Sequence, residues 1–203
     1  MSEFIKNLEE NKEEKIIKIG KALKEGKIVV FPTETVYGIG VNGLNKEAVK
    51  KLFEVKERPL DKPISLLVSD FEMIEKVAKN ISELEYKIMK KYFPGPMTIV
   101  LDKKDIVPDE VTAKGSTVGI RMPDNEDILK IIKEAGVPIA TPSANISGRP
   151  SGTNIEMIKM DFGDKVDIYV DGGESKIGIP STIVKVEDNE IKVLRQGSIY
   201  IEI

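Results

Sequence analysis

The chain has 203 residues, a length that suits one domain with a sizeable core, and its 40% hydrophobic and 32% charged residues are typical of a soluble globular protein. It contains no cysteine and no histidine, which excludes disulfides, thiolate nucleophiles, Ser-His catalysis and zinc sites built from those residues. The net charge of −3 argues against a surface coated for non-specific nucleic-acid binding. No apolar run could span a membrane and the first residues do not resemble a signal peptide, so we expect a cytoplasmic location.

The first part of the chain alternates helical patterns with short apolar runs. Amphipathic helices are predicted at residues 12–25, 45–56, 70–78 and 83–92, and apolar strands at residues 27–31 and 64–68. Gly26 marks the end of the first helix and Asn45 caps the second. Ser82 and Glu85 have the spacing of a capping box at the start of the fourth helix.

The second part continues this alternation and ends in a hairpin. Strands are predicted at residues 97–101, 117–121, 137–140 and 166–170, followed by a hairpin of residues 182–186 with 190–194. A helix capped by Asp124 is predicted to end at Gly136, and a shorter one to begin at Asn154. The order of elements predicts an α/β fold with a mixed sheet. No linker divides the chain, so we expect residues 1–203 to form a single domain.

Two glycine-rich stretches imitate nucleotide-binding motifs. Residues 38–43 match GxGxxG, with Asp61 at a suitable distance, but residues 32–37 separate them from the preceding strand. A dinucleotide-binding loop turns directly from strand into helix, so this match is weak. Residues 173–178 begin like a P-loop, yet Ile179 and Pro180 replace the required lysine and hydroxyl residue, which excludes that motif.

Arginine is scarce in this chain and is placed at the ends of elements. Of the 31 cationic residues only four are arginine, namely Arg58, Arg121, Arg149 and Arg195, and each lies close to a proline or glycine. The planar guanidinium binds phosphate or carboxylate in a way that lysine cannot reproduce. The placement therefore indicates anionic ligands. The alternative is chance placement combined with anchoring of loops.

Residues 138–152 contain the densest run of polar side chains. They follow a short predicted strand, and loops at the carboxyl ends of strands bind ligands in α/β proteins. A solvated connector would have a similar composition. Similar polar ends occur at residues 33–35, 56–62, 116–121, 181–182 and 195. If the fold brings them together, they form a cationic, hydroxyl-rich pocket without a nucleophile–base pair, which suits phosphoryl or adenylyl transfer.

These polar segments also carry a resemblance. They are residues 31–38, 56–59, 62–63, 94–98, 118–123, 138–145, 180–183 and 194–197, and in this order they resemble the motifs of the YrdC/TsaC family. The likeness runs from about residue 12 to residue 197. Longer members of the family carry an additional C-terminal domain. The likeness to the YrdC-like domain takes up nearly all of this chain, so we expect a single YrdC-like domain here.

The resemblance implies a twisted α/β fold around a large positively charged cleft and a nucleotidyltransferase activity, L-threonylcarbamoyladenylate synthase. L-threonine, bicarbonate and ATP would give threonylcarbamoyl-AMP and pyrophosphate. A downstream tRNA threonylcarbamoyl transferase complex would then modify adenosine 37 of tRNA, with a transient tRNA contact as a further expectation. Mg²⁺ would accompany ATP, held mainly by the substrate, because no acidic cluster dedicated to a metal is evident.

The resemblance also implies roles for individual residues. The signature positions, expected to be catalytic, are Lys56, Arg58, Ser143 and Asn145. Threonine binding is expected at Thr35, Arg121, Thr141 and Ser181. ATP binding is expected at Arg58, Lys62, Thr117, Ser143, Ser151 and Arg195. Leu67 departs from relatives that carry histidine there, and Arg149 either closes over the nucleotide or anchors its loop.

Two other functions are compatible with the residues. An RNA-binding module without catalysis would use the same basic groove, although the acidic net charge and the lack of aromatic clusters disfavour it. A related carbamoyl-adenylate activity would take carbamoyl phosphate in place of threonine and bicarbonate. Arg121 with the hydroxyls of Thr35 and Thr141 favours an amino acid.

Overall fold

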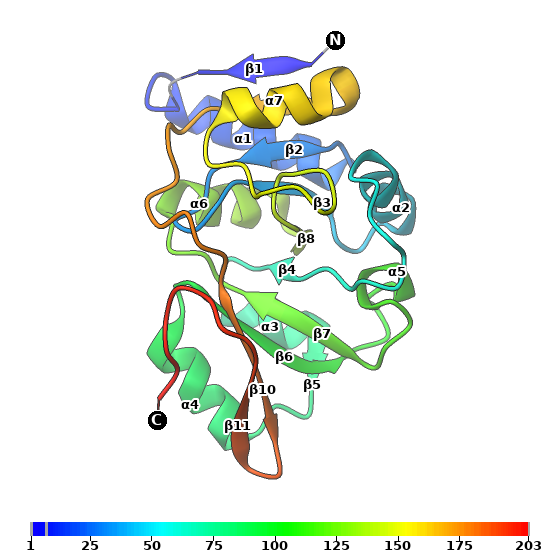
Figure 1. The fold of residues 1–203 in the computed structure, drawn as a ribbon, viewed down its shortest axis with the longest axis vertical. Helices are drawn as coiled ribbons and strands as arrows, with labels where there is room; N and C mark the ends of the chain where they lie inside the picture. The colour runs from blue at the N-terminus through cyan, green and yellow to red at the C-terminus, as the bar shows by residue number, and fades with distance from the viewer. Residues whose placement is uncertain (1, 7, 203) are drawn as a thin grey trace.

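The computed structural model describes residues 2–6 and 8–202 and has one long mixed β-sheet with helices packed against it (Figure 1). Its strands are β1 Glu3–Ile5, β2 Val29–Phe31, β3 Gly38–Asn42, β4 Leu66–Leu67, β5 Ala78–Lys79, β6 Met97–Lys103, β7 Thr117–Arg121, β8 Ile139–Ala140, β9 Ile168–Val170, β10 Thr182–Glu187 and β11 Glu190–Arg195. Among the described residues their spatial order is β1-β9-β2-β3-β8-β4-β7-β6-β10-β11, with β5 beside β6. Parallel and antiparallel pairs both occur, which confirms the predicted mixed sheet.

The helices cover the sheet and follow the predicted order. They are α1 Lys12–Lys24, α2 Lys46–Val55, α3 Phe71–Val77, α4 Glu83–Tyr92, α5 Asp109–Thr112, α6 Glu126–Ala135 and α7 Ile155–Phe162, followed by a 3₁₀ turn at Gly163–Lys165. The caps at Asn45 and at Ser82 with Glu85 are confirmed by side-chain hydrogen bonds. Among the described residues, no helix is long and apolar enough to cross a membrane.

The predicted cap of α6 is wrong by one residue. Asn125, not Asp124, has the extended backbone of a cap, and its side chain accepts a hydrogen bond from the Ile128 backbone N–H at 3.2 Å. Both residue types cap helices well, so the sequence alone does not separate them. The exposed Asp124 lies just before the helix start.

The stretch that imitates a dinucleotide motif is the buried strand β3. It pairs antiparallel with β2 and with β8, so its glycines do not open a helix. A Cβ on Gly38 would lie 2.6 Å from the Thr141 side chain, and one on Gly40 would lie 2.7 Å from Ile139. These glycines therefore allow close packing between strands, and the weak dinucleotide match is excluded.

The sheet brings distant segments to one region. Leu67 at the end of β4 is in register with Arg121 at the end of β7, and the Thr141 backbone N–H donates to the Ser65 carbonyl at 2.9 Å. On the other side of β7, Thr98 of β6 is in register with Ile183 of β10. The ends of β4, β7, β8 and β10 thus meet around one hollow.

Candidate functional site

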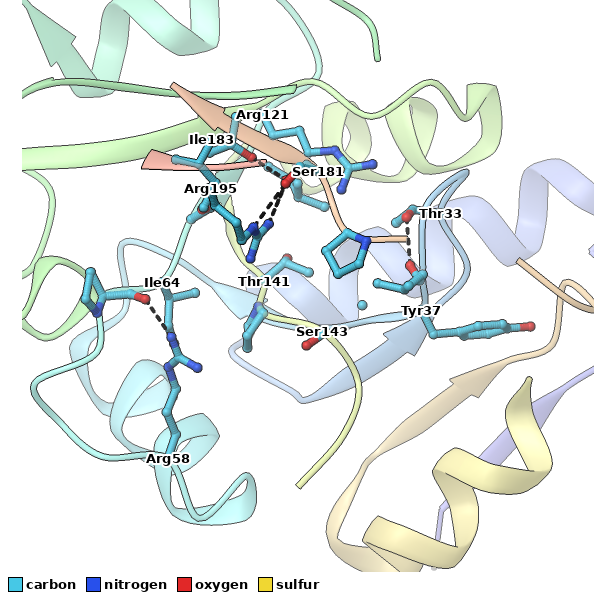
Figure 2. Close-up of a pocket in the computed structure, with 18 residues that line it drawn as sticks. Thr33, Tyr37, Arg58, Ile64, Arg121, Thr141, Ser143, Ser181, Ile183 and Arg195 are labelled. Carbon is cyan, nitrogen blue, oxygen red and sulfur yellow. Dashed lines mark hydrogen bonds between the residues drawn. The ribbon is translucent and has the colours of Figure 1, made fainter. Parts of the chain in front are cut away.

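A pocket lies in this hollow and gathers most of the polar segments singled out in the sequence (Figure 2). The predicted site residues that line it are Arg58, Arg121, Thr141, Ser143, Ser181 and Arg195. Thr33, Tyr37, Ser65 and Thr98 line it as well. The pocket thus combines three guanidinium groups with several hydroxyls, and it has no nucleophile–base pair of the usual Ser-His or Cys-His kind because the chain lacks histidine and cysteine.

Arg121, at the end of β7, is the most buried arginine of the pocket. Its Nη2 lies 2.7 Å from Glu34 Oε1, and both side chains are 9% exposed. The Nη2 group is held by this ion pair without the geometry of a hydrogen bond, and the Nε–H has no partner among the described residues. A buried N–H without an acceptor is costly, so the free edge of this guanidinium is well suited to a carboxylate or phosphate ligand.

Ser181 and Arg195 form a second polar group beside Arg121. Arg195 donates from Nε and Nη2 to the Ser181 carbonyl at 3.1 and 2.7 Å, and the Ser181 hydroxyl lies 2.8 Å from that of Thr98. Partial burial, together with the positive charge of Arg121, lowers the pKa of Arg195 below its ordinary value. Two guanidinium groups that repel each other across a pocket favour an anion between them.

Arg58 enters the pocket from the loop that follows α2 (Figure 2). Its Nε donates to the Lys62 carbonyl at 3.1 Å and its Nη2 to the Pro63 carbonyl at 2.8 Å. Burial lowers its pKa as well, and the carboxylate of Asp61 acts in the opposite direction. The backbone therefore holds the Arg58 guanidinium in place before any ligand binds. The side chain of Lys62 is exposed and does not line the pocket.

Lys56 is buried beneath the 143–145 loop and does not line the pocket. Its Nζ donates to the carbonyls of Ser143 at 2.6 Å and Asn145 at 2.5 Å, and the residue is 1% exposed. Burial lowers the pKa of Lys56 to about 7; the nearby charge of Arg58 adds to the effect and that of Asp161 opposes it. In this arrangement Lys56 holds the loop in position, and its catalytic role stays a prediction.

Asn145 and Arg149 also stabilise this loop. The Asn145 amide donates to the carbonyls of Ile146 at 3.0 Å and Arg149 at 2.9 Å, and its oxygen accepts from the Ser143 hydroxyl at 2.6 Å. The Arg149 guanidinium lies 2.6 Å from Asp161, whose other oxygen accepts from the Ile146 backbone. Arg149 therefore anchors the loop in this structure, which is one of the two roles predicted for it.

The hydroxyl groups divide between the pocket and the core behind it. Thr33 lines the pocket, whereas Thr35, predicted to bind threonine, is fully buried with its hydroxyl 2.9 Å from that of Thr33. Thr141 lines the pocket and donates to the Ile139 carbonyl at 3.1 Å. The buried Thr35 hydroxyl thus helps to hold the Thr33 side chain at the pocket wall.

Besides Lys62, two more residues predicted to bind ATP lie outside this pocket. Thr117 is at the start of β7, paired with Asp102, whereas the pocket lies at the other end of that strand. Ser151 is partly buried and does not line the pocket. Their contacts with a nucleotide stay predictions, as does that of Lys62.

Sequence reasoning assigned no binding role to four hydroxyl residues of the pocket, namely Thr33, Tyr37, Ser65 and Thr98. Thr98 lies inside β6, in a run that reads as a buried strand, and only its register with Ile183 brings it to the site. Ser65 is next to β4, and the signal that could have found it is a hydroxyl at the edge of an apolar run. Leu67 lines the pocket as an apolar side chain, so it supplies no polar contact.

Comparison with known proteins places this site in a family. A family profile for Sua5, YciO and YrdC proteins, described as "Telomere recombination", matches residues 21–197. Threonylcarbamoyl-AMP synthase of Pyrococcus abyssi is 44% identical over 200 residues, covering 98% of this chain and 59% of the relative. A putative threonylcarbamoyl-AMP synthase of Methanocaldococcus jannaschii is 43% identical over 205 residues, covering 99% of this chain and 96% of the relative.

Solved structures agree with the family assignment. P. abyssi Sua5 complexed with L-threonine matches with a TM-score of 0.90 and 42% identity, over 97% of this chain and 57% of that one. Escherichia coli YciO matches with a TM-score of 0.84 at 24% identity, which shows a shared fold. The chain thus spans little more than half the length of the P. abyssi protein. It belongs to the Sua5/YciO/YrdC family.

Proposed function

We propose that the protein is an L-threonylcarbamoyladenylate synthase, which converts L-threonine, bicarbonate and ATP to threonylcarbamoyl-AMP and pyrophosphate. The observation that carries the proposal is the buried Arg121 guanidinium, whose Nε–H has no partner among the described residues, in a pocket that also holds Arg58 and Arg195. The 42% identity to a structure complexed with L-threonine supports an amino acid as one ligand.

Threonine recognition would follow from the residue types. The Arg121 guanidinium would pair with the α-carboxylate, and hydroxyls of Thr33, Thr141 and Ser181 would surround the amine and the side-chain hydroxyl. A site that pairs the substrate hydroxyl rejects valine strongly, because its polar groups would be left unpaired. Serine lacks only a methyl group, so its rejection would be about ten-fold or somewhat more.

The chemistry would be positioning and charge neutralisation. The threonine amine and bicarbonate condense to a carbamate with loss of water. A carbamate oxygen then attacks the α-phosphorus of ATP, and the bond to the leaving pyrophosphate breaks. Arg58 and Arg195 would neutralise the charge that develops on the phosphoryl oxygens, which needs no histidine. The exposed Lys62 side chain, next to the carbonyls that hold Arg58, would reach the outer phosphates.

Mg²⁺ is proposed to arrive with the nucleotide. Over residues 2–6 and 8–202, no group of three or more acidic side chains is arranged to hold a metal ion. The protein side chains therefore do not form a metal cage, and the triphosphate oxygens would supply the ligands.

The proposed product implies the partners. Threonylcarbamoyl-AMP is a mixed anhydride, so a downstream tRNA threonylcarbamoyl transferase complex would consume it for modification of adenosine 37. A brief tRNA contact and a cytoplasmic location belong to the same proposal.

The test is pyrophosphate release from ATP by the purified protein. Release is expected to require both L-threonine and bicarbonate, and a panel of valine, serine and carbamoyl phosphate checks the substrate class. Absence of threonine-dependent release from folded protein would contradict the proposal. Release with carbamoyl phosphate alone would support the related carbamoyl-adenylate activity, and tight RNA binding unaffected by ATP and threonine would support the RNA-binding module.

A further inference from the structure

Glu34 is a buried carboxylate that the proposed reaction does not use. It lies between Thr33 and Thr35, is 8% exposed, and lines a second cavity but not the main pocket. Its Oε1 lies 2.7 Å from Nη2 of Arg121, which does line the main pocket. Glu34 therefore contacts the guanidinium of Arg121 and would not contact a ligand bound in the main pocket.

The backbone holds Glu34 rigidly in this place. Its carbonyl accepts from the Ile177 N–H at 3.0 Å, and the Thr35 carbonyl accepts from the Gly178 N–H at 2.8 Å. The Thr33 hydroxyl accepts from the Thr35 N–H at 3.2 Å and donates to the Val36 carbonyl at 2.7 Å, which closes a tight turn around Glu34. A carboxylate on such a fixed backbone can set the position of its partner.

Two other carboxylates of the second cavity are engaged elsewhere. Asp127 lies 2.8 Å from Nζ of Lys12, and Asp171 accepts a hydrogen bond from the Gly173 N–H at 3.0 Å. Within the described part of the chain, Glu34 is the carboxylate that lies within ion-pair distance of Arg121. The countercharge of this guanidinium thus comes from one residue.

Arg121 needs that countercharge because a second cation is close. The charge of Arg121 contributes to the lowered pKa of Arg195, so the two guanidinium groups repel each other. Removing one partner of a buried ion pair leaves an uncompensated charge in a poorly solvated place. Without Glu34, Arg121 would therefore turn toward water or away from Arg195, and the fork would lose its orientation.

We propose that Glu34 is the positioning residue for Arg121 and thereby sets the affinity of the pocket for the carboxylate of its amino-acid substrate; this inference rests on the proposed function. Glu34 also repels that carboxylate directly. The two carboxylates would be separated by the guanidinium group, so their repulsion acts over a longer distance than the ion pair between Glu34 and Arg121. The positioning effect is therefore larger than the direct repulsion.

The test measures threonine and ATP affinities by calorimetry for the wild type and for Glu34→Gln, which keeps the shape and removes the charge. Threonine binding is expected to weaken at least about ten-fold, and ATP binding to change by less than about three-fold. Glu34→Asp keeps the charge on a shorter side chain and is expected to recover part of the affinity. Glu174→Gln, the same change at an exposed residue of the second cavity, is the matched control and should bind threonine like the wild type.

A double-mutant cycle tests whether Glu34 acts through Arg121. Arg121→Lys keeps the charge and loses the fork, so adding Glu34→Gln to it should weaken threonine binding much less than in the wild-type background. Independent, additive losses would overturn the inference, and so would unchanged or tighter threonine binding in Glu34→Gln. If Glu34→Gln does not fold, the same cycle is run with Glu34→Asp, and independent, additive losses of threonine affinity there overturn the inference. A wild-type protein that binds no threonine would instead overturn the proposed function.

Discussion

The pocket arginines divide their hydrogen bonds between the protein backbone and the space left for a ligand. Arg58 donates to two carbonyls of the 62–63 segment, and Arg195 donates twice to the Ser181 carbonyl. Each guanidinium is thus fixed in its plane while other N–H groups stay available. Fixing these long side chains in advance reduces the conformational entropy lost when an anion binds.

Replacing Arg58 tests this preorganisation. Arg58→Ala is expected to lower kcat for pyrophosphate release by about 100-fold or more, as for loss of one transition-state charge contact. The circular dichroism spectrum should stay that of a folded protein. Arg149→Ala removes an arginine that pairs with Asp161 outside the pocket, and KM for ATP is expected to change by less than about three-fold. Near-normal turnover in Arg58→Ala would contradict its role, and a large rise in KM for Arg149→Ala would indicate contact with the nucleotide.

Lys56 should make the free energy of unfolding depend on pH. Its folded pKa of about 7 lies below the ordinary value of 10.5, so between these values the unfolded chain binds a proton that the folded protein does not. Stability therefore rises with pH across this window, and the cost of charging the buried amine is fully present below pH 7. Relative to Lys56→Met, the wild type is expected to gain on the order of a few kcal/mol between pH 7 and pH 10.

Urea unfolding of both proteins at several pH values measures this difference. The variant lacks the hydrogen bonds from Lys56 to the Ser143 and Asn145 carbonyls at every pH, so that loss shifts its curve without changing the slope. Parallel stability curves for the two proteins would contradict the lowered pKa.

At the scale of elements, β3 is packed so closely that its glycines shape the pocket. A Cβ on Gly40 would lie 2.9 Å from the Thr141 hydroxyl oxygen and 2.7 Å from Ile139. A Cβ on Gly38 would meet the Thr141 methyl group at 2.6 Å. The position of the Thr141 side chain therefore depends on the absence of side chains on the neighbouring strand.

Gly40→Ala is expected to destabilise the protein by roughly 1–3 kcal/mol through overpacking and to weaken threonine binding by displacing Thr141. Gly115→Ala is the control, because its added Cβ would meet only the Thr112 carbonyl oxygen, at 3.0 Å, outside the pocket. Thermal unfolding and threonine calorimetry measure the two effects. Equal behaviour of the two variants would show that β3 tolerates a side chain beside Thr141.

The elements that sequence predicts well are those with a strong period or a capping pattern. Helices α1, α2, α4 and α6 and the β10–β11 hairpin follow their predicted ranges closely. The elements that were not predicted are of two kinds. The very short ones are β1, β5 and α5, and the glycine-rich one is β3. Short pieces form through pairing with distant strands, so local pattern does not encode them.

The candidate site shows the same limit. Scarce arginines and hydroxyl-rich loop ends predicted Arg58, Arg121 and Arg195, because such residues have few other uses at strand ends. Sequence could not separate the side chains that face the pocket from those that hold its walls. Lys56 and Asn145 are of the second kind, since burial and backbone contacts decide that distinction.

At the scale of the whole molecule, the pocket draws on segments from almost the full length of the chain. Thr33, Arg58, Arg121, Thr141 and Arg195 come from five separate connections or strand ends. Figure 1 shows the region between β3 and β10 where these segments meet in the middle of the long axis. A ligand bound there contacts both halves of the sheet, so its binding energy should stabilise the entire fold.

Ligand binding is therefore expected to raise the thermal midpoint. At 100 times Kd, threonine would add about 2.7 kcal/mol to the free energy of unfolding. For a chain of 203 residues this corresponds to a rise of roughly 5–10 °C. Differential scanning calorimetry with threonine, and with valine as the control, measures the effect. The same rise with valine would contradict recognition of the side-chain hydroxyl.

The β10–β11 hairpin has a consequence for the newly made chain. Ser181 and Arg195 flank this hairpin, and β10 joins the rest of the sheet through its parallel pairing with β6. During synthesis, the central strands can assemble on the ribosome while the anion-binding wall of the pocket is still missing. The pocket is consequently complete only once the chain has been made as far as Arg195, so a shorter nascent chain cannot draw on ligand binding for its stability.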